Sequence, residues 1–93
     1  MVIGCCQIEI HLPGSGSLKE KRRVIVSLRD RLRRRHNVSF AEVEHQELWQ
    51  RAGLVVVSVA GDRRQLDRLF EIIRGELTRT VPGEVVQFAV EYI

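Results

Sequence analysis

The order of helical and strand-like segments is the feature that most constrains how this chain folds. Apolar residues recur at helical spacing over 18–36 and from 63 to about 80, and each segment lies between two stretches with the pattern of a strand. These strand patterns cover 2–12, 38–44, 54–60 and 86–92. The chain therefore repeats the unit strand, helix, strand once within 93 residues.

Two such units combine in few ways, because a helix that connects two parallel strands crosses over right-handed in nearly all proteins. Interleaving them gives one four-stranded antiparallel sheet in the order fourth, first, third, second, with two helices on one face. The predicted fold class is α+β, with the ferredoxin-like βαββαβ arrangement. Two cores would each bury too little surface at this length, so residues 1–93 are predicted to form a single domain.

The first helix has a clear start signal. Ser17 and Glu20 form a capping box, in which the hydroxyl accepts from the Glu20 N–H and the carboxylate reaches back. We therefore expect the helix to begin at Leu18. Lys21 projects to the centre of its apolar stripe, and we expect its ammonium group to extend past the sheet edge rather than meet an anion. The stripe itself consists of Leu18, Val24, Ile25, Leu28 and Leu32.

Positive charge is concentrated between residues 17 and 36. This stretch holds nine of the fifteen Lys and Arg residues and two acids, so it carries +7 in a chain whose total is +3. The rest of the chain is therefore net −4, and the polarised surface fits an anionic partner. We predict that structured RNA or a ribosomal particle is bound through its phosphates. The predicted contacts are Lys19, Arg22, Arg23, Arg29, Arg33, Arg34 and Arg35.

An ordinary solvated helix is the alternative interpretation of the same charges. The last arginines complement the negative end of the helix dipole, and Asp30 is expected to pair with Arg34. Base stacking on the sheet is not expected, because the outward positions of the first strand are not aromatic and the third strand has no aromatic residue. RNA binding would therefore depend on phosphate or shape.

The glycine-rich loop at 13–17 is a second candidate site. Glycines let backbone N–H groups approach an anion at the start of a helix. The sequence GSGSLK lacks the spacing of a P-loop and the third glycine of a dinucleotide-binding loop. A flexible turn is the favoured interpretation, and an anion or phosphate ligand is the alternative. That ligand would be bound by Ser15, Gly16, Ser17 and Lys21.

Catalytic and metal-binding patterns are not evident. His11, His36 and His45 are scattered without metal-ligand spacing, and no serine has the context of a nucleophile elbow. Cys5 and Cys6 are adjacent in a strand and point to opposite faces, so we expect packing rather than a disulfide. We expect no cofactor and no metal, and a non-catalytic protein is favoured over an enzyme.

The chain has no apolar run of about 18 residues and no pattern of a secretory signal, so we expect no membrane span and a cytoplasmic location.

Asn37 suits a left-handed cap after the first helix. Trp49 is favoured as a lid over the core edge, with a partner anchor as the alternative. Val86 is expected to alternate inward with Phe88. The opposite sheet face is wet or covered by a partner and contains Gln7, Glu9, His11, Gln87 and Glu91.

Three blocks of sequence resemble a known family: HLPGSGSLKEKRR over 11–23, NVSFAEV over 37–43 and HQELWQRA over 45–52. They are similar to those of the YlxP-like family of small bacterial proteins, catalogued as a domain of unknown function. The resemblance covers essentially the whole chain and implies a ferredoxin-like domain in the bacterial cytoplasm. Members are often encoded beside translation and ribosome-maturation factors, which adds weight to an RNA-linked role. The family has no established catalytic residues, so none is transferred.

Three functional hypotheses follow in order. The first is a non-catalytic binding module for structured RNA or a ribosomal particle, which uses the basic helix. The second is a protein-interaction or homodimerisation module that uses the open sheet face or the edge strand. The third is an enzyme or ligand-binding protein centred on His11, Ser15, Ser17 and Lys21.

Overall fold

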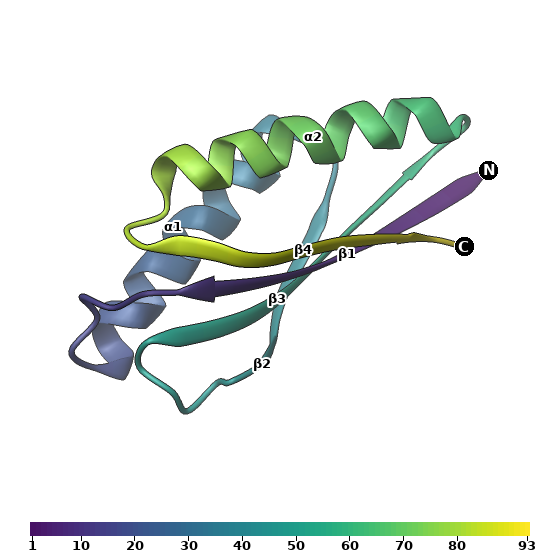
Figure 1. The fold of residues 1–93 in the computed structure, drawn as a ribbon. Helices are drawn as coiled ribbons and strands as arrows, with labels where there is room; N and C mark the ends of the chain where they lie inside the picture. The colour runs from purple at the N-terminus through teal and green to yellow at the C-terminus, as the bar shows by residue number, and fades with distance from the viewer.

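Six elements follow one another in the order β1, α1, β2, β3, α2, β4 in the computed structural model, which describes residues 1–93 (Figure 1). The strands form one antiparallel sheet in the order β2-β3-β1-β4. This confirms the predicted ferredoxin-like α+β fold. Neither helix is long and apolar enough to cross a membrane. The bounds are Val2–His11, Leu18–Arg35, Ser39–Glu44, Arg51–Ala60, Arg63–Thr80 and Glu84–Tyr92.

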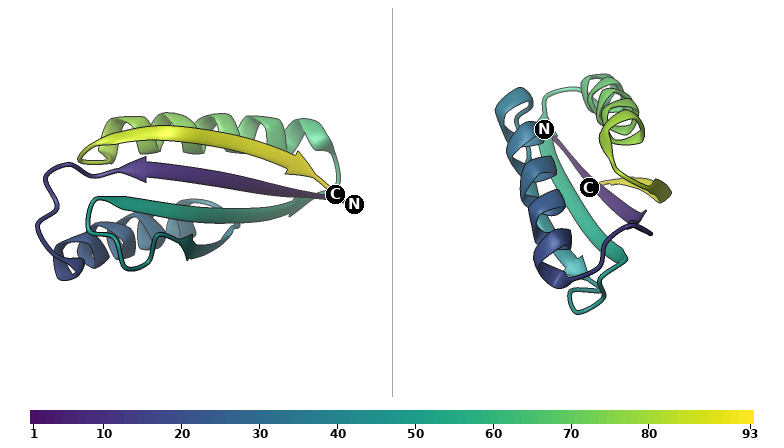
Figure 2. Two further views of the ribbon diagram at one scale, coloured as in Figure 1. Left: turned by 60° about the horizontal axis from the view of Figure 1, so that its bottom comes forward. Right: turned by 90° about the vertical axis from the view of Figure 1, so that its left-hand side faces the viewer.

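One hydrophobic core lies between the helices and the sheet. Alternate residues of β1 are buried, and Cys6 and Ile8 lie opposite Val56 and Leu54 of β3. Both helices contribute to the same core, so both cover one face of the sheet (Figure 2). Cys6 is buried in this core, whereas Cys5 is half-buried on the opposite face, and both are free thiols. The buried helix residues are Ile25, Leu28, Leu32, Leu66, Phe70, Ile73 and Leu77.

Both helices begin at the residues expected from the sequence, Leu18 and Arg63, and a side chain caps each start. The Ser17 Oγ accepts from the Glu20 N–H at 3.1 Å, and the Asp62 Oδ1 accepts from the Arg64 N–H at 2.8 Å. These bonds satisfy backbone donors that have no partner within the helix.

The predicted left-handed cap at Asn37 is wrong. His36 is the C-cap of α1 with extended backbone, and its N–H donates to the Leu32 carbonyl at 2.9 Å. His45 is the one non-glycine residue with positive φ, at 60°. The chain therefore uses left-handed geometry at the end of β2, not after α1.

Strand boundaries depart further from the sequence pattern. β3 begins at Arg51, three residues before the apolar run, because its first residues pair with the end of β1. The register between β1 and β4 shifts between Glu9 and Ile10, which is a β-bulge. The predicted inward position of Val86 is therefore wrong, and this side chain is 50% exposed.

Candidate functional site

Six of the seven cations predicted to contact nucleic acid are exposed on α1, and Arg29 is half-buried. Arg22, Arg29 and Arg33 lie seven and four residues apart, so they share one flank of the helix. This flank faces the edge strand, since Arg22 and Arg29 line a hollow together with Phe40 of β2. On the same helical geometry, Lys19, Arg23 and Arg34 lie on the outward side, and Arg35 reaches toward α2.

Most of these cations have no acidic partner. Arg29 pairs with Asp30, with both donor atoms 3.0 Å from Oδ1, so the expected pair between Asp30 and Arg34 is wrong. Arg35 lies 3.9 Å from the Glu76 carboxylate. No carboxylate lies within ion-pair distance of the remaining five, so their charge is not neutralised within the protein. These are Lys19, Arg22, Arg23, Arg33 and Arg34.

The glycine-rich loop is closed by its own side chains. The Gly16 N–H donates to the Glu20 Oε2 at 2.6 Å, and the buried Ser15 donates its hydroxyl to the Ser17 carbonyl at 3.2 Å. The Glu20 carboxylate thus sits where an anion would be held at the start of a helix. An external anion bound by Ser15, Gly16 and Ser17 would have to replace it, and ligand binding here stays a prediction.

Lys21 does not extend past the sheet edge as expected, because its side chain is fully buried. Its Nζ donates to the carbonyls of His45, Gln46 and Arg51 at 2.8, 3.3 and 3.2 Å. The Glu42 carboxylate lies 2.9 Å from the same nitrogen. An ammonium group has three donors, so its hydrogen-bonding capacity is used inside the protein. Lys21 therefore ties α1 to the connection between β2 and β3.

A second set of contacts fixes this connection to β1. The Glu9 Oε2 accepts a hydrogen bond from the Arg51 Nη2 at 2.8 Å. The other carboxylate oxygen, Oε1, lies 2.8 Å from the His45 Nε2. The Arg51 guanidinium, followed by the His45 imidazole, holds the pKa of Glu9 below its usual range. The Gln50 side chain donates to the carbonyls of Pro13 and Ser15. The connection is therefore anchored on α1, on β1 and on the glycine-rich loop.

Trp49 is 53% exposed, so the predicted lid over the core edge is wrong. Leu48 beside it is 46% exposed. Both line an open hollow of about 520 Å³, together with His11 and Arg51. The polar residues around Trp49 hold the loop, while the two large apolar side chains remain at the surface.

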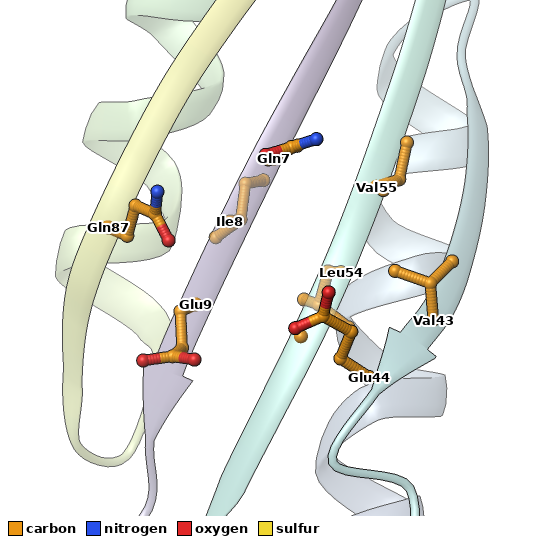
Figure 3. A pocket seen from close by; sticks show the side chains of 9 residues that line it. Gln7, Ile8, Glu9, Val43, Glu44, Leu54, Val55 and Gln87 are labelled. Atoms are coloured by element: carbon orange, nitrogen blue, oxygen red, sulfur yellow. The ribbon is translucent and has the colours of Figure 1, made fainter.

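The sheet face away from the helices has a polar and an apolar part. Gln7, Glu9 and Gln87 line a shallow hollow of about 120 Å³, and Figure 3 shows them on the near face of β1 and β4. Val55 lies across from Gln7 on β3 in the same hollow. Val57 and Val59 continue this row along β3, and Val59 is 51% exposed. Sequence reasoning missed this row because a continuous apolar run does not reveal which residues face outward.

Comparison with known proteins places the chain in a family. Residues 3–90 match the family described as "Protein of unknown function (DUF503)". The chain belongs to this family. The protein "Uncharacterized protein YlxP" of Bacillus subtilis (strain 168) is 33% identical over 86 residues, which cover 86% of this chain and 94% of the relative. The resemblance drawn from the three sequence blocks is thereby confirmed.

A solved structure that aligns with 100% of this chain is LarC2, the C-terminal domain of a cyclometallase involved in the synthesis of the NPN cofactor of lactate racemase, in its apo form. The two are 12% identical with a TM-score of 0.44, and this chain spans 56% of that one.

Proposed function

We propose that this family member is a non-catalytic module that binds structured RNA, free or within a ribosomal particle, through the exposed cations of α1. The observation that supports the proposal is the set of five exposed cations on α1 without an acidic partner. Solubility alone does not call for +7 on one element of a chain whose remainder is −4.

The length of the basic surface suits a nucleic-acid backbone. From Lys19 to Arg34 the helix rises about 22 Å, at about 1.5 Å per residue. Cations spread over this length can neutralise several phosphates of one strand or of both strands of a duplex. The chain contains three Phe, one Tyr and one Trp, and none of them lies on α1. Recognition would therefore read phosphate positions and shape rather than base identity.

Affinity for a structured RNA, measured as a function of salt, tests the proposal. If the five free cations each neutralise one phosphate, the logarithm of the binding constant falls with that of salt with a slope of about −4. Arg33→Glu/Arg34→Glu should weaken binding and reduce the slope by about 2. Arg68→Glu/Arg79→Glu is the matched control, because both residues are exposed and unpaired on α2. Salt-insensitive binding, or none at micromolar protein, would overturn the proposal.

The row of valines on β3 favours a second candidate function, which is self-association through the open sheet face. Val59 is 51% exposed, and Val43 and Val86 are 48% and 50% exposed near the two edges of the sheet. Exposed apolar side chains on an uncovered sheet face are a candidate interaction site. Light scattering of the wild type and of Val59→Glu tests it, since a monomer in both excludes the homodimer.

A further inference from the structure

An open cavity of about 280 Å³ lies between the middle of α1 and the segment that ends α2. Arg23, Ser27 and Arg31 line it from α1 and are four residues apart, so they stand one above the other on successive turns. Thr80 and Pro82 close it from the other side. None of the functions considered so far uses Arg31 or Ser27.

The polar side chains that α1 contributes to this cavity are hydrogen-bond donors. Arg23 and Arg31 present guanidinium groups, and neither has an ion-pair partner. Ser27 is exposed, and no protein group accepts from its hydroxyl. The Thr80 hydroxyl donates to the Glu76 carbonyl at 2.7 Å, which turns its hydrogen away from the cavity. No acidic residue lines the cavity.

Arg31 has a buried hydrogen-bond donor without an acceptor. Its Nη1 is shielded from solvent and has no acceptor within the protein. A buried guanidinium N–H without an acceptor is unfavourable and rare in folded proteins. Nη1 is not accessible to a water-sized group in this rotamer, so Arg31 would turn it toward an oxygen ligand in the adjacent cavity, which would supply the acceptor that the protein does not.

Three acidic residues on α1 and α2 do not pair with Arg31. Glu20 caps the start of α1 through Gly16, and Asp30 is bound by Arg29. Glu76 of α2 lies against His36 at 3.0 Å through its Oε1, and its Oε2 is buried without a partner. No Arg31 nitrogen lies within ion-pair distance of any of these carboxylates.

We infer that the cavity between α1 and α2 is an oxyanion site that takes a phosphate group, bound by Arg23 and Arg31 with the Ser27 hydroxyl. Guanidinium groups bind phosphate oxygens through paired N–H donors, and two of them on one side match the charge of a phosphate. The volume is several times the roughly 30 Å³ that one water molecule occupies in the liquid, so a partly hydrated phosphate fits. Two sources share this chemistry, an RNA backbone phosphate and a free phosphate compound. The first source rests on the proposed RNA binding, and the second does not.

The first test is the midpoint of thermal unfolding in millimolar inorganic phosphate or pyrophosphate, against chloride at equal ionic strength. We expect the wild type to unfold at higher temperature in the phosphate compounds, because a ligand of the folded state stabilises it. Arg23→Gln/Arg31→Gln should abolish this difference. Arg33→Gln/Arg34→Gln removes the same charge from α1 outside the cavity and should retain it.

Two results would overturn the site. One is a wild type that responds to phosphate no more than to chloride. The other is an equal response in all variants, which is the general effect of a kosmotropic salt. Because Arg31 is partly buried and its replacement could impair folding, Arg23→Gln alone is the second variant. Arg23 is exposed, and its loss should reduce the response without affecting the fold.

RNA affinity then separates the two sources. If Arg23→Gln/Arg31→Gln lowers the affinity for RNA and the salt slope by more than Arg33→Gln/Arg34→Gln, a pair outside the cavity, does, the phosphate belongs to an RNA backbone. If RNA binding is unchanged while the phosphate response is lost, the site takes a free phosphate compound. A wild type that responds to phosphate but binds no RNA would disprove the proposed function and leave this site intact.

Discussion

Lys21 places a positive charge where the helical pattern calls for an apolar residue. Moving an ammonium group out of water costs several kcal/mol, and this cost is offset only by well-placed oxygens. Three carbonyls and the Glu42 carboxylate supply them, and all four belong to β2, to its connection with β3 or to the first residue of β3. The residue therefore determines where that connection lies relative to α1.

Replacing Lys21 with Met should destabilise the protein by about 3–5 kcal/mol, because it leaves the Glu42 carboxylate without its ion-pair partner and three carbonyls without their donor. The double variant Lys21→Met/Glu42→Gln should recover part of the loss. The free energy of unfolding in urea measures both, with Lys19→Met as the exposed control, expected within about 0.5 kcal/mol of wild type. If Lys21→Met proved no less stable than Lys19→Met, the buried contacts would have no energetic role.

Glu9 should make folding depend on pH in the acid range. Its pKa is lowered in the folded state by Arg51 and His45, so the folded protein binds this proton less readily than the unfolded chain does. The stabilisation is fully present above the unfolded pKa of about 4.3 and is lost as the pH falls through the lower, folded pKa. Urea unfolding of Glu9→Gln should therefore differ from wild type near neutral pH and converge with it in acid. Glu91→Gln, at an exposed unpaired carboxyl, should not show this convergence.

At the scale of elements, the start of α1 is defined by short-range contacts. Ser17→Ala removes the acceptor of the Glu20 N–H and should cost about 1 kcal/mol of stability. Ser27→Ala, in the middle of the same helix, should be neutral or slightly stabilising, because alanine is the better helix former. Thermal or urea unfolding distinguishes the two. An equal effect of both substitutions would contradict the capping role of Ser17.

The elements that could be predicted from the sequence are those specified by neighbours in the chain. Ser17 with Glu20 and Asp62 with Arg64 act within three residues, so both helix starts were predicted correctly. The start of β3 at Arg51 and the bulge beside Val86 depend on pairing with β1, which no local pattern contains. Cross-strand register therefore accounts for the errors in the strands.

In the candidate site, too, features set by neighbours in the chain could be predicted, and features set by distant contacts could not. The charge on α1 was visible in the sequence, because helical spacing alone separates buried from exposed positions. The link between Lys21 and residues 42–51 joins positions 21 to 30 residues apart, so it required the fold. Trp49 was misplaced for a related reason: the contacts that hold its loop come from Lys21, Glu9 and the backbone of the glycine-rich loop, not from the tryptophan itself.

At the scale of the whole molecule, the two candidate surfaces lie on opposite sides. The cations of α1 lie on the layer of helices, whereas the valine row of β3 lies on the uncovered face of the sheet (Figure 2). A partner on one surface leaves the other accessible. RNA binding and self-association through the sheet are therefore compatible within one protein.

Substitutions on the two faces should consequently act independently. Val59→Glu should prevent any self-association while leaving the salt slope of RNA binding unchanged, because the new charge is on the side opposite the cations. Arg33→Glu/Arg34→Glu should weaken RNA binding without changing the molar mass measured by light scattering. In the combined variant the two effects should add, as expected for distant sites without shared partners. A salt slope that changes in Val59→Glu would show instead that RNA contacts the sheet face or that binding requires the dimer.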